Sequence, residues 1–191
     1  MLSGVVENMV EFKGYFYLSQ KTSGMLKSVK HYHCIVMELM ETSLEELMYD
    51  EKKKVPFSLP TIRKIAYDIA LGMQSVHSYD ILHRDIKPAN VLMSRTKQKG
   101  VYSVKIADFG YARRDTNESI RKSVVGTPAY LAPELIGQTK SFDVGKPSDV
   151  YSYGVILWEF ASGKRPHDGL EAANLYQRVS DATKTGKPVF E

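Results

Sequence analysis

The stretch HRDIKPAN, residues 83–90, places a histidine, an arginine, an aspartate, a lysine and an asparagine within eight positions. Nothing in this stretch is periodic, so it predicts a loop rather than a helix face or a strand. A second acid, Asp108, follows in KIADFG after a strand-like run. This concentration of acids, cations and an amide outside any amphipathic pattern indicates a functional site.

Each polar residue of this region suits one requirement of phosphoryl transfer. An ionised Asp85 only accepts hydrogen bonds, so it can take or orient a hydroxyl proton. Lys87 is a compact cation that could neutralise a phosphate oxygen. Asn90 and Asp108 offer hard oxygen ligands of the kind that Mg²⁺ prefers. Together they predict phosphoryl transfer, in which catalysis consists of positioning and charge stabilisation.

The clearest expected helix covers residues 58–78, just before the loop. Ser58 is a good N-cap and Pro60 suits the first turn. Apolar residues recur at steps of three and four and predict one buried face, formed by Ile62, Ile65, Ile69, Met73 and Val76. We expect the polar residues Arg63, Lys64 and Asp68 to lie off that face.

Other segments predict a mixed α+β chain. The remaining expected elements are strands at 9–18 and 32–39, a short helix within 42–54, strands at 90–94 and 103–110, a long polar loop at 111–128, and helices at 147–163 and 171–182. The two pairs of strands should each form an antiparallel hairpin. A loop as long as 111–128 inside a compact domain is typically functional or disordered.

Composition excludes several classes of protein. The 191 residues, 43% apolar and 25% charged, are enough for one large domain or two small ones. The net charge of +4 is mild and no basic block alternates with aromatic residues, so we do not expect nucleic-acid binding. No apolar run reaches the length of a membrane span, and the first residues do not resemble a secretory signal. We therefore expect a cytoplasmic protein, with the single Cys34 as a buried, inert thiol.

The motifs resemble those of the eukaryotic protein kinase family. HRDIKPAN is similar to its catalytic loop, with Ile86 in place of the usual leucine, and DFG (108–110) and APE (132–134) match two further signatures. SDVYSYGVILWE (148–159) resembles the buried helix that supports the catalytic loop. The resemblance implies a two-lobed α+β fold, with a small-lobe remnant and hinge in residues 1–40 and a mostly helical large lobe in 41–191.

The resemblance also implies roles for individual residues. Asp85 would be the catalytic base, Lys87 would contact the γ-phosphate of ATP, and Thr127 would bridge the two. Asn90 and Asp108 would hold Mg²⁺, and Asp149 would brace the loop through its backbone. The residues implied to bind ATP are Met37 as the gatekeeper, Glu38 and Met40 through their backbones, Leu92 beneath the adenine, and Lys87, Asn90 and Asp108 at the phosphates. His83 and Phe109 would pack against each other.

The same resemblance indicates the class of substrate. Lys87 after HRDI, and GTPAYLAPE (126–134), are similar to kinases that phosphorylate serine and threonine. SDVYSYGVILWE and TSLEEL look closer to the tyrosine-kinase-like group. An upstream kinase could act on the 111–127 loop, which holds Thr116, Ser119, Ser123 and Thr127, and the phosphate could pair with Arg84. The expected partners are thus ATP, Mg²⁺ and a protein with a Ser or Thr acceptor.

Two signatures of the family are missing. The chain has neither a G-x-G-x-x-G loop nor a lysine in a V-A-I-K context before NMVEF. We therefore expect a catalytic domain cut short at both ends, marginally stable and weakly active or inactive alone. With the last helices of the fold missing, Glu134 would be left unpaired at a buried site.

Two other functions remain open. The missing lysine and glycine loop favour a pseudokinase-like binding scaffold, whereas the intact base and metal ligands oppose it. A small-molecule phosphotransferase would share the metal-binding acid, but GTPAYLAPE resembles a peptide-docking platform that small substrates do not require.

Overall fold

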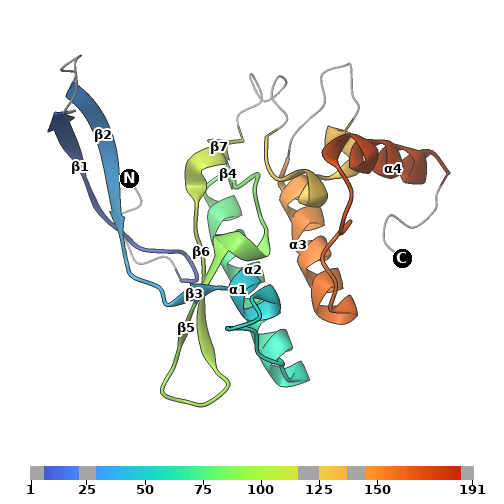
Figure 1. Cartoon of the computed structure of the whole chain (residues 1–191), viewed down its shortest axis with the longest axis horizontal. Helices are drawn as coiled ribbons and strands as arrows, with labels where there is room; N and C mark the ends of the chain where they lie inside the picture. Colours follow the sequence, from blue (N-terminus) through green and yellow to red (C-terminus); the bar gives the residue numbers. More distant parts are fainter. Residues whose placement is uncertain (1–6, 22–28, 116–124, 137–144, 186–191) are drawn as a thin grey trace.

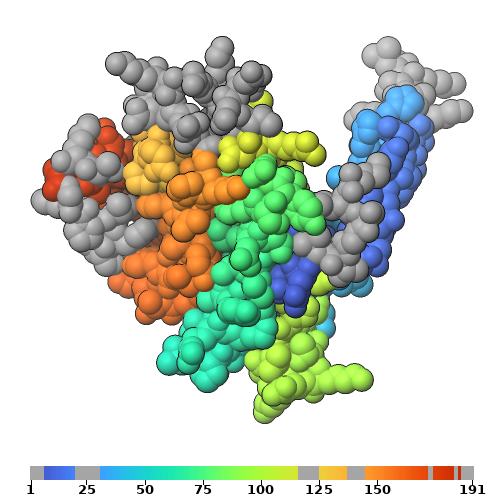
Figure 2. All heavy atoms as spheres, turned by 180° about the vertical axis from the view of Figure 1, so that it is seen from behind, coloured from blue at the N-terminus to red at the C-terminus, as the bar shows by residue number. Residues whose placement is uncertain are grey.

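An antiparallel hairpin stands out from the helical body of the molecule (Figures 1 and 2). The computed structural model describes residues 7–21, 29–115, 125–136 and 145–185. Strand β1 (Phe12–Lys21) pairs with β2 (Val29–Met37), and Phe16 lies opposite Cys34. The expected hairpin is confirmed, although β1 begins later and β2 earlier than the sequence predicted. Cys34 is half-buried, so its expected burial is wrong, because this hairpin is not enclosed in a core.

The residues before β1 explain this shift, because they pair with a strand of the large body. The backbone N–H of Val10 donates to Ile106 O (2.9 Å), and Ile106 N–H donates to Asn8 O (2.8 Å). A Cβ atom on Gly72 would lie 2.7 Å from Asn8 O, so only glycine at that helical position permits the approach. Residues 8–10 therefore belong to the large body rather than to the hairpin.

A short helix follows the crossing from the hairpin. Strand β3 (Thr42–Ser43) leads into α1 (Leu44–Tyr49), where the Ser43 side chain accepts a hydrogen bond from Glu46 N–H at 3.2 Å. Ser43 is therefore the N-cap of this helix. The helix ends earlier than expected because Asp50 takes an extended conformation and begins a turn.

Helix α2 (Leu59–Ser78) forms as predicted and carries much of the core. Ser58 caps it, accepting from Thr61 N–H at 3.3 Å. The apolar face packs inward, and its buried members are Ile65, Ile69, Met73 and Val76. Asp68 was expected off the buried face but is only 3% exposed. Lys64 Nζ, one turn earlier, lies 2.5 Å from the Asp68 carboxylate, and this ion pair offsets the cost of burying the Asp68 charge.

The second predicted hairpin lies on α2 and carries the 83–90 loop at one end. Strand β5 (Val91–Arg95) pairs with β3 and with β6 (Tyr102–Ile106), and β4 (Ile81–Leu82) pairs with β7 (Arg113–Arg114). The chain leaves β6 at Ile106, four residues before the predicted end. Asp108 adopts a left-handed conformation (φ 62°) and starts the short 3₁₀ helix η2 (Phe109–Tyr111).

Two further helices complete the body. Helix α3 (Lys146–Ser162) ends at Gly163, whose φ of 68° suits glycine, and α4 (Ala172–Thr185) follows. Three other 3₁₀ turns are η1 (Pro88–Asn90), η4 (Pro128–Tyr130) and η5 (Pro133–Leu135). Glu134 was expected buried and unpaired, but it is exposed and accepts a hydrogen bond from the Ser148 hydroxyl at 3.2 Å. Its position at the surface of η5 lets water solvate it.

Two hydrophobic clusters hold this body together. The larger joins α1, α2, β5, β6 and α3, and the smaller joins η4 and η5 to Leu175 and Val179 of α4. Among the described residues, no helix has the length and apolar character needed to cross a membrane. The observed α+β architecture, a strand hairpin beside a mostly helical part, is the one that the resemblance implied.

Candidate active site

One buried acid of α3 fixes the backbone of the 83–90 loop. Asp149, 2% exposed, accepts hydrogen bonds from the backbone N–H of His83 (2.9 Å) and of Arg84 (2.8 Å). The His77 ring lies 2.8 Å from the same carboxylate. Arg84 has a φ of 67°, a conformation that such a residue rarely adopts. The two backbone bonds to Asp149 hold the loop in this strained form, as the predicted bracing requires.

His83 connects this loop to the turn after β6. Its Nε2 lies 2.9 Å from the Ala107 carbonyl, and Asp85 N–H donates to its Nδ1 at 3.3 Å, an arrangement that suits a neutral ring with the proton on Nε2. Burial lowers the pKa of His83 and favours the same neutral form. The ring packs edge-on against Phe109, with centroids 5.0 Å apart. The expected packing of His83 with Phe109 is therefore observed.

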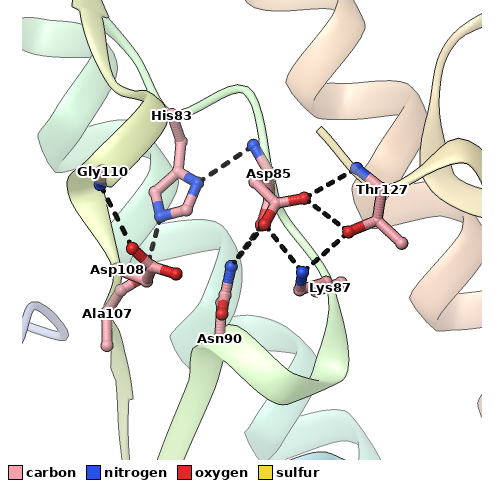
Figure 3. A network of polar contacts seen from close by, with 8 residues as sticks. All are labelled: His83, Asp85, Lys87, Asn90, Ala107, Asp108, Gly110 and Thr127. Atoms are coloured by element: carbon pink, nitrogen blue, oxygen red, sulfur yellow. Dashed lines mark hydrogen bonds and ion pairs between the residues drawn. The ribbon is translucent and has the colours of Figure 1, made fainter. Parts of the chain in front are cut away.

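The Asp85 carboxylate receives four hydrogen bonds (Figure 3). Thr127 donates to Oδ1 through its backbone N–H (2.9 Å) and its hydroxyl (2.8 Å). Asn90 Nδ2 donates to Oδ2 at 3.0 Å, and Lys87 Nζ lies 2.8 Å from the same oxygen. Burial raises the pKa of Asp85, but the bonds from Lys87 and Thr127 outweigh burial, so the pKa lies below its usual value. Asp85 is thus ionised at neutral pH.

Asp85, Lys87 and Thr127 form a closed triangle, because Lys87 Nζ also donates to Thr127 Oγ1 at 2.7 Å. Gly126 lets the Thr127 segment come this close. Its φ is +113°, and a Cβ atom there would lie 2.5 Å from the Arg84 carbonyl oxygen. Only glycine combines this conformation with so short an approach. The bridging position expected for Thr127 is therefore present in the geometry.

Asn90 and Asp108 lie at the same end of the β5–β6 hairpin (Figure 3). Both donors of the Asn90 amide nitrogen are directed at Asp85, at its carbonyl (2.8 Å) and its carboxylate, which leaves Oδ1 for a ligand. Asp108 is exposed and its Oδ1 accepts from Gly110 N–H at 3.2 Å. Hard oxygen donors of this kind fit Mg²⁺. The described residues contain no cluster of three His, Cys, Asp or Glu suited to a metal, so phosphate oxygens would have to complete the shell.

The residues expected at the adenine lie between the hairpin and β5. Met37 ends β2 and is half exposed, Met40 is half-buried beside Ser94, and Leu92 lies in β5. No described residue bonds to the backbone N–H or C=O of Met40 or to the C=O of Glu38. These backbone groups are therefore available to a ligand.

The Glu38 side chain has a structural role that the sequence did not reveal. Its Oε1 accepts from Glu11 N–H (2.7 Å) and from Lys105 Nζ (2.6 Å), which joins the start of β1 to β6. Burial raises the pKa of Glu38, but these two bonds lower it by more. No local pattern could have indicated the pair, because Glu38 and Lys105 are 67 positions apart.

A second unpredicted cluster surrounds Glu159 of α3. This side chain is fully buried and accepts hydrogen bonds from the hydroxyls of Tyr49 (2.7 Å) and Tyr130 (3.2 Å). Burial raises the pKa of Glu159 to about 7, although the two tyrosines counteract it. The apolar run around Glu159 indicated a buried helix, but the partners lie too far away in sequence to be predicted.

The expected phosphorylation sites Thr116, Ser119 and Ser123 lie outside the described residues. Arg84, their expected partner, is half-buried. Its Nε donates to Tyr111 O at 2.5 Å. Burial and the neighbouring Arg113 lower the pKa of Arg84. Arg84 and Arg113 thus form a basic pair beside the 83–90 loop.

Comparison with family models matches residues 3–187 to the protein kinase domain. The chain belongs to the protein kinase family. Serine/threonine-protein kinase STY46 of Arabidopsis thaliana is 41% identical over 137 residues, which cover 71% of this chain and 22% of that kinase. Serine/threonine/tyrosine-protein kinase HT1, also from Arabidopsis thaliana, is 33% identical over 138 residues, 72% of this chain and 33% of that kinase. The chain thus spans between about a fifth and a third of the length of these relatives.

A solved structure supports the fold of this kinase chain. The crystal structure of the yeast RNA Pol II CTD kinase CTDK-1 complex contains a chain that matches with a TM-score of 0.71 and 26% identity. The match covers 94% of this chain and 52% of the other. The predicted protein kinase family and the predicted fold class are both confirmed. Protein kinases as a family use ATP with Mg²⁺, and the oxygen donors described above fit that pair.

Proposed function

We propose that this chain transfers the γ-phosphate of ATP to a serine or threonine hydroxyl of a protein. The observation that carries the proposal is the triangle of Asp85, Lys87 and Thr127, in which an ionised carboxylate lies beside a cation and a hydroxyl. STY46, which is named as a serine/threonine kinase, supports the choice of acceptor, whereas the name of HT1 also includes tyrosine.

Each member of the triangle has a separate role. Asp85 orients the acceptor hydroxyl and receives its proton as the acceptor oxygen bonds to the γ-phosphorus and the bond to ADP breaks. Lys87 neutralises charge on the γ-phosphate, and Thr127 holds Asp85 and Lys87 in fixed positions relative to each other. Asp149 contributes indirectly, because it binds the backbone N–H groups of His83 and Arg84, which directly precede Asp85.

The remaining site residues would hold the nucleotide and the metal. The backbones of Glu38 and Met40 would bind the adenine edge, beside Met37 and above Leu92. Asn90 Oδ1 and the Asp108 carboxylate would hold Mg²⁺, which when bound neutralises the phosphate charge. An upstream kinase acting on the 111–127 loop would bring a phosphate within reach of Arg84.

The test is phosphate transfer by the purified chain, measured with γ-labelled ATP, Mg²⁺ and protein acceptors. We expect slow transfer, because no G-x-G-x-x-G segment is present to position the phosphates. Asp85→Asn should reduce it by a further factor of about 10²–10⁴, the usual contribution of a catalytic base. Asp50→Asn, at an exposed site beyond α1, is the matched control. Transfer by Asp85→Asn at the wild-type rate would exclude the proposed base.

A binding scaffold without phosphoryl transfer is a second candidate function. This function requires nucleotide or protein binding but no turnover. Thermal stabilisation of the chain by ATP and Mg²⁺, together with no labelled product from any acceptor, would favour the scaffold over the enzyme.

A further inference from the structure

A groove opens directly beside the catalytic triangle. Its volume is about 360 Å³, and Lys87 and Thr127 of the triangle belong to its lining. Glu45 of α1 also lines it, as do Arg165 and its neighbours in the loop between α3 and α4. We call it the Arg165 groove. If the proposed function holds, a polypeptide whose hydroxyl reaches Asp85 has its neighbouring residues in this groove.

Two contacts fix the position of the Arg165 side chain. Its Nη1 donates to Glu45 Oε1 at 2.7 Å, and its guanidinium lies 4.2 Å from the centroid of the Tyr49 ring. The side chain is still 45% exposed, and its other N–H groups have no hydrogen-bond partner among the described residues. A guanidinium fixed by one acid and one ring retains donors for a second carboxylate.

The acidic side chains around the groove are paired, buried or screened by solvent, so they attract a cation only weakly. Glu45 is already paired with Arg165. Glu159 is fully buried beneath two tyrosine hydroxyls, so an incoming side chain cannot reach it. Asp168 is exposed at the rim, where water and salt screen its charge.

Apart from Glu45 and Asp168, no residue that lines the groove carries an acidic side chain. A lysine or arginine entering the groove would have to displace Arg165 from Glu45. It would also lie near Lys87, a cation already bound to Asp85. Like charges in this position oppose binding, which serves as selection against the wrong partner.

We propose that Arg165 is a specificity determinant that selects acceptor segments with an aspartate or glutamate close to the phosphorylated serine or threonine. The carboxylate of such a residue receives the remaining N–H groups of Arg165. Because Glu45 and Tyr49 fix the guanidinium beforehand, little side-chain freedom is lost on binding.

The proposal is tested by peptide binding in the absence of ATP, with fluorescence anisotropy as the readout. Three labelled peptides contain one serine and differ only in flanking residues, which are glutamate, glutamine or lysine. The wild-type chain should bind the glutamate peptide about three- to tenfold more tightly than the lysine peptide, as expected for a partly exposed charge pair. Arg165→Glu should reverse this order, and Arg165→Gln should reduce it to near equality.

A matched control separates Arg165 from the general charge of the protein. Arg63→Glu makes the same charge change on the exposed side of α2 and should retain the wild-type order. Far-UV circular dichroism verifies that each variant is folded, and Arg165→Gln tests the proposal if Arg165→Glu unfolds. An unchanged order in the Arg165 variants, tighter binding of the lysine peptide by wild type, or no binding of any peptide would each overturn the inference.

The experiment also separates this inference from the proposed function. Labelled transfer to the same peptides is measured in parallel. Transfer without a charge preference would refute the role of Arg165 and leave the kinase activity intact. The expected binding order without any transfer would support Arg165 as a determinant of binding and count against phosphoryl transfer.

Discussion

Tyr15 and Tyr17 of the β1–β2 hairpin are 63% and 64% exposed, whereas Ile69 of α2 and Ile156 of α3 are fully buried. The hairpin depends on the hydrogen bonds between its two strands and on contacts such as the Tyr17–His33 ring pair, with centroids 4.7 Å apart. The helical body depends on buried apolar area, which is the larger source of stability per residue.

The difference divides the proposed active site between two kinds of support. Asp85, Lys87, Asn90 and Thr127 lie on the body, where a buried acid and a packed core fix them. The backbones of Glu38 and Met40 lie where the hairpin joins the body. We therefore expect changes in the core to affect the whole chain and changes at the hairpin to affect nucleotide binding more than stability.

The largest effect should come from the core. Ile69→Ala removes a fully buried side chain at the centre of α2 and leaves a cavity, at a cost of about 2–5 kcal/mol in the free energy of unfolding. Ile35→Ala in β2, where the side chain is 67% exposed, should cost less than about 1 kcal/mol. Urea unfolding followed by circular dichroism measures both. Equal costs would show that the hairpin is as well packed as the body in solution.

Next in size is a pH effect from Glu159. Its pKa is about 7 in the folded chain against an ordinary 4.5, so the folded state holds the proton more tightly. This contribution to stability is fully present below pH 4.5 and is lost as the pH rises through 7, by about 3 kcal/mol at 1.4 kcal/mol per unit. Glu159→Gln should abolish this decline.

Unfolding free energies of wild type and Glu159→Gln, compared from pH 4.5 to 8, isolate this residue from the other acids. Glu51→Gln is the control, since Glu51 is exposed in the turn after α1. A difference between wild type and Glu159→Gln that does not change with pH would contradict the raised pKa.

A smaller loss is expected from the brace beneath the 83–90 loop. Asp149→Asn keeps the shape but sets an N–H₂ group against a backbone N–H of His83 or Arg84, which costs about 1–3 kcal/mol. Amide exchange of residues 83–90 should increase together with this loss. Asp181→Asn on the exposed face of α4 is the control. Unchanged exchange in the loop would mean that Asp149 is not its main support.

The smallest effect should arise at the attachment of the hairpin. Glu38→Gln weakens the hydrogen bonds that the Glu38 side chain accepts from Glu11 N–H and from Lys105. Because the side chains of Glu38 and Lys105 are about one-fifth exposed, the change should cost about 0.5–1 kcal/mol in the free energy of unfolding. Hydrogen exchange should increase in β1 and β2 but not in α2. Glu41→Gln, three residues further on and exposed, is the control. Faster exchange in α2 as well would show that hairpin and body unfold as one unit.

The sequence predicted best the elements whose signals are local. Ser58, Pro60 and the apolar steps of α2 lie within one segment, and so do the motifs at residues 83–90 and 108–110. The hairpin strands were shifted because aromatic residues fill both faces and give no alternation to set the register. Residues 8–10 pair instead with β6, a partner almost 100 positions away.

Side-chain partners distant in sequence could not be predicted. Glu134 accepts a hydrogen bond from Ser148, 14 positions later, and Glu38 accepts one from Lys105, 67 positions later. Both contacts depend on how separate elements pack. The Glu159 cluster joins three separate elements. The sequence therefore predicted candidate site residues but not the contacts that hold them in place.

The close approach of Gly126 to the Arg84 carbonyl has a consequence for the proposed base. Thr127, the next residue, donates to Asp85 through both its backbone N–H and its hydroxyl, so both bonds depend on the position of one segment. A displacement of this segment would remove two of the four hydrogen bonds to Asp85 at once, along with part of what keeps its pKa low. The basicity of Asp85 thus depends in part on a residue that lies 42 positions further along the chain.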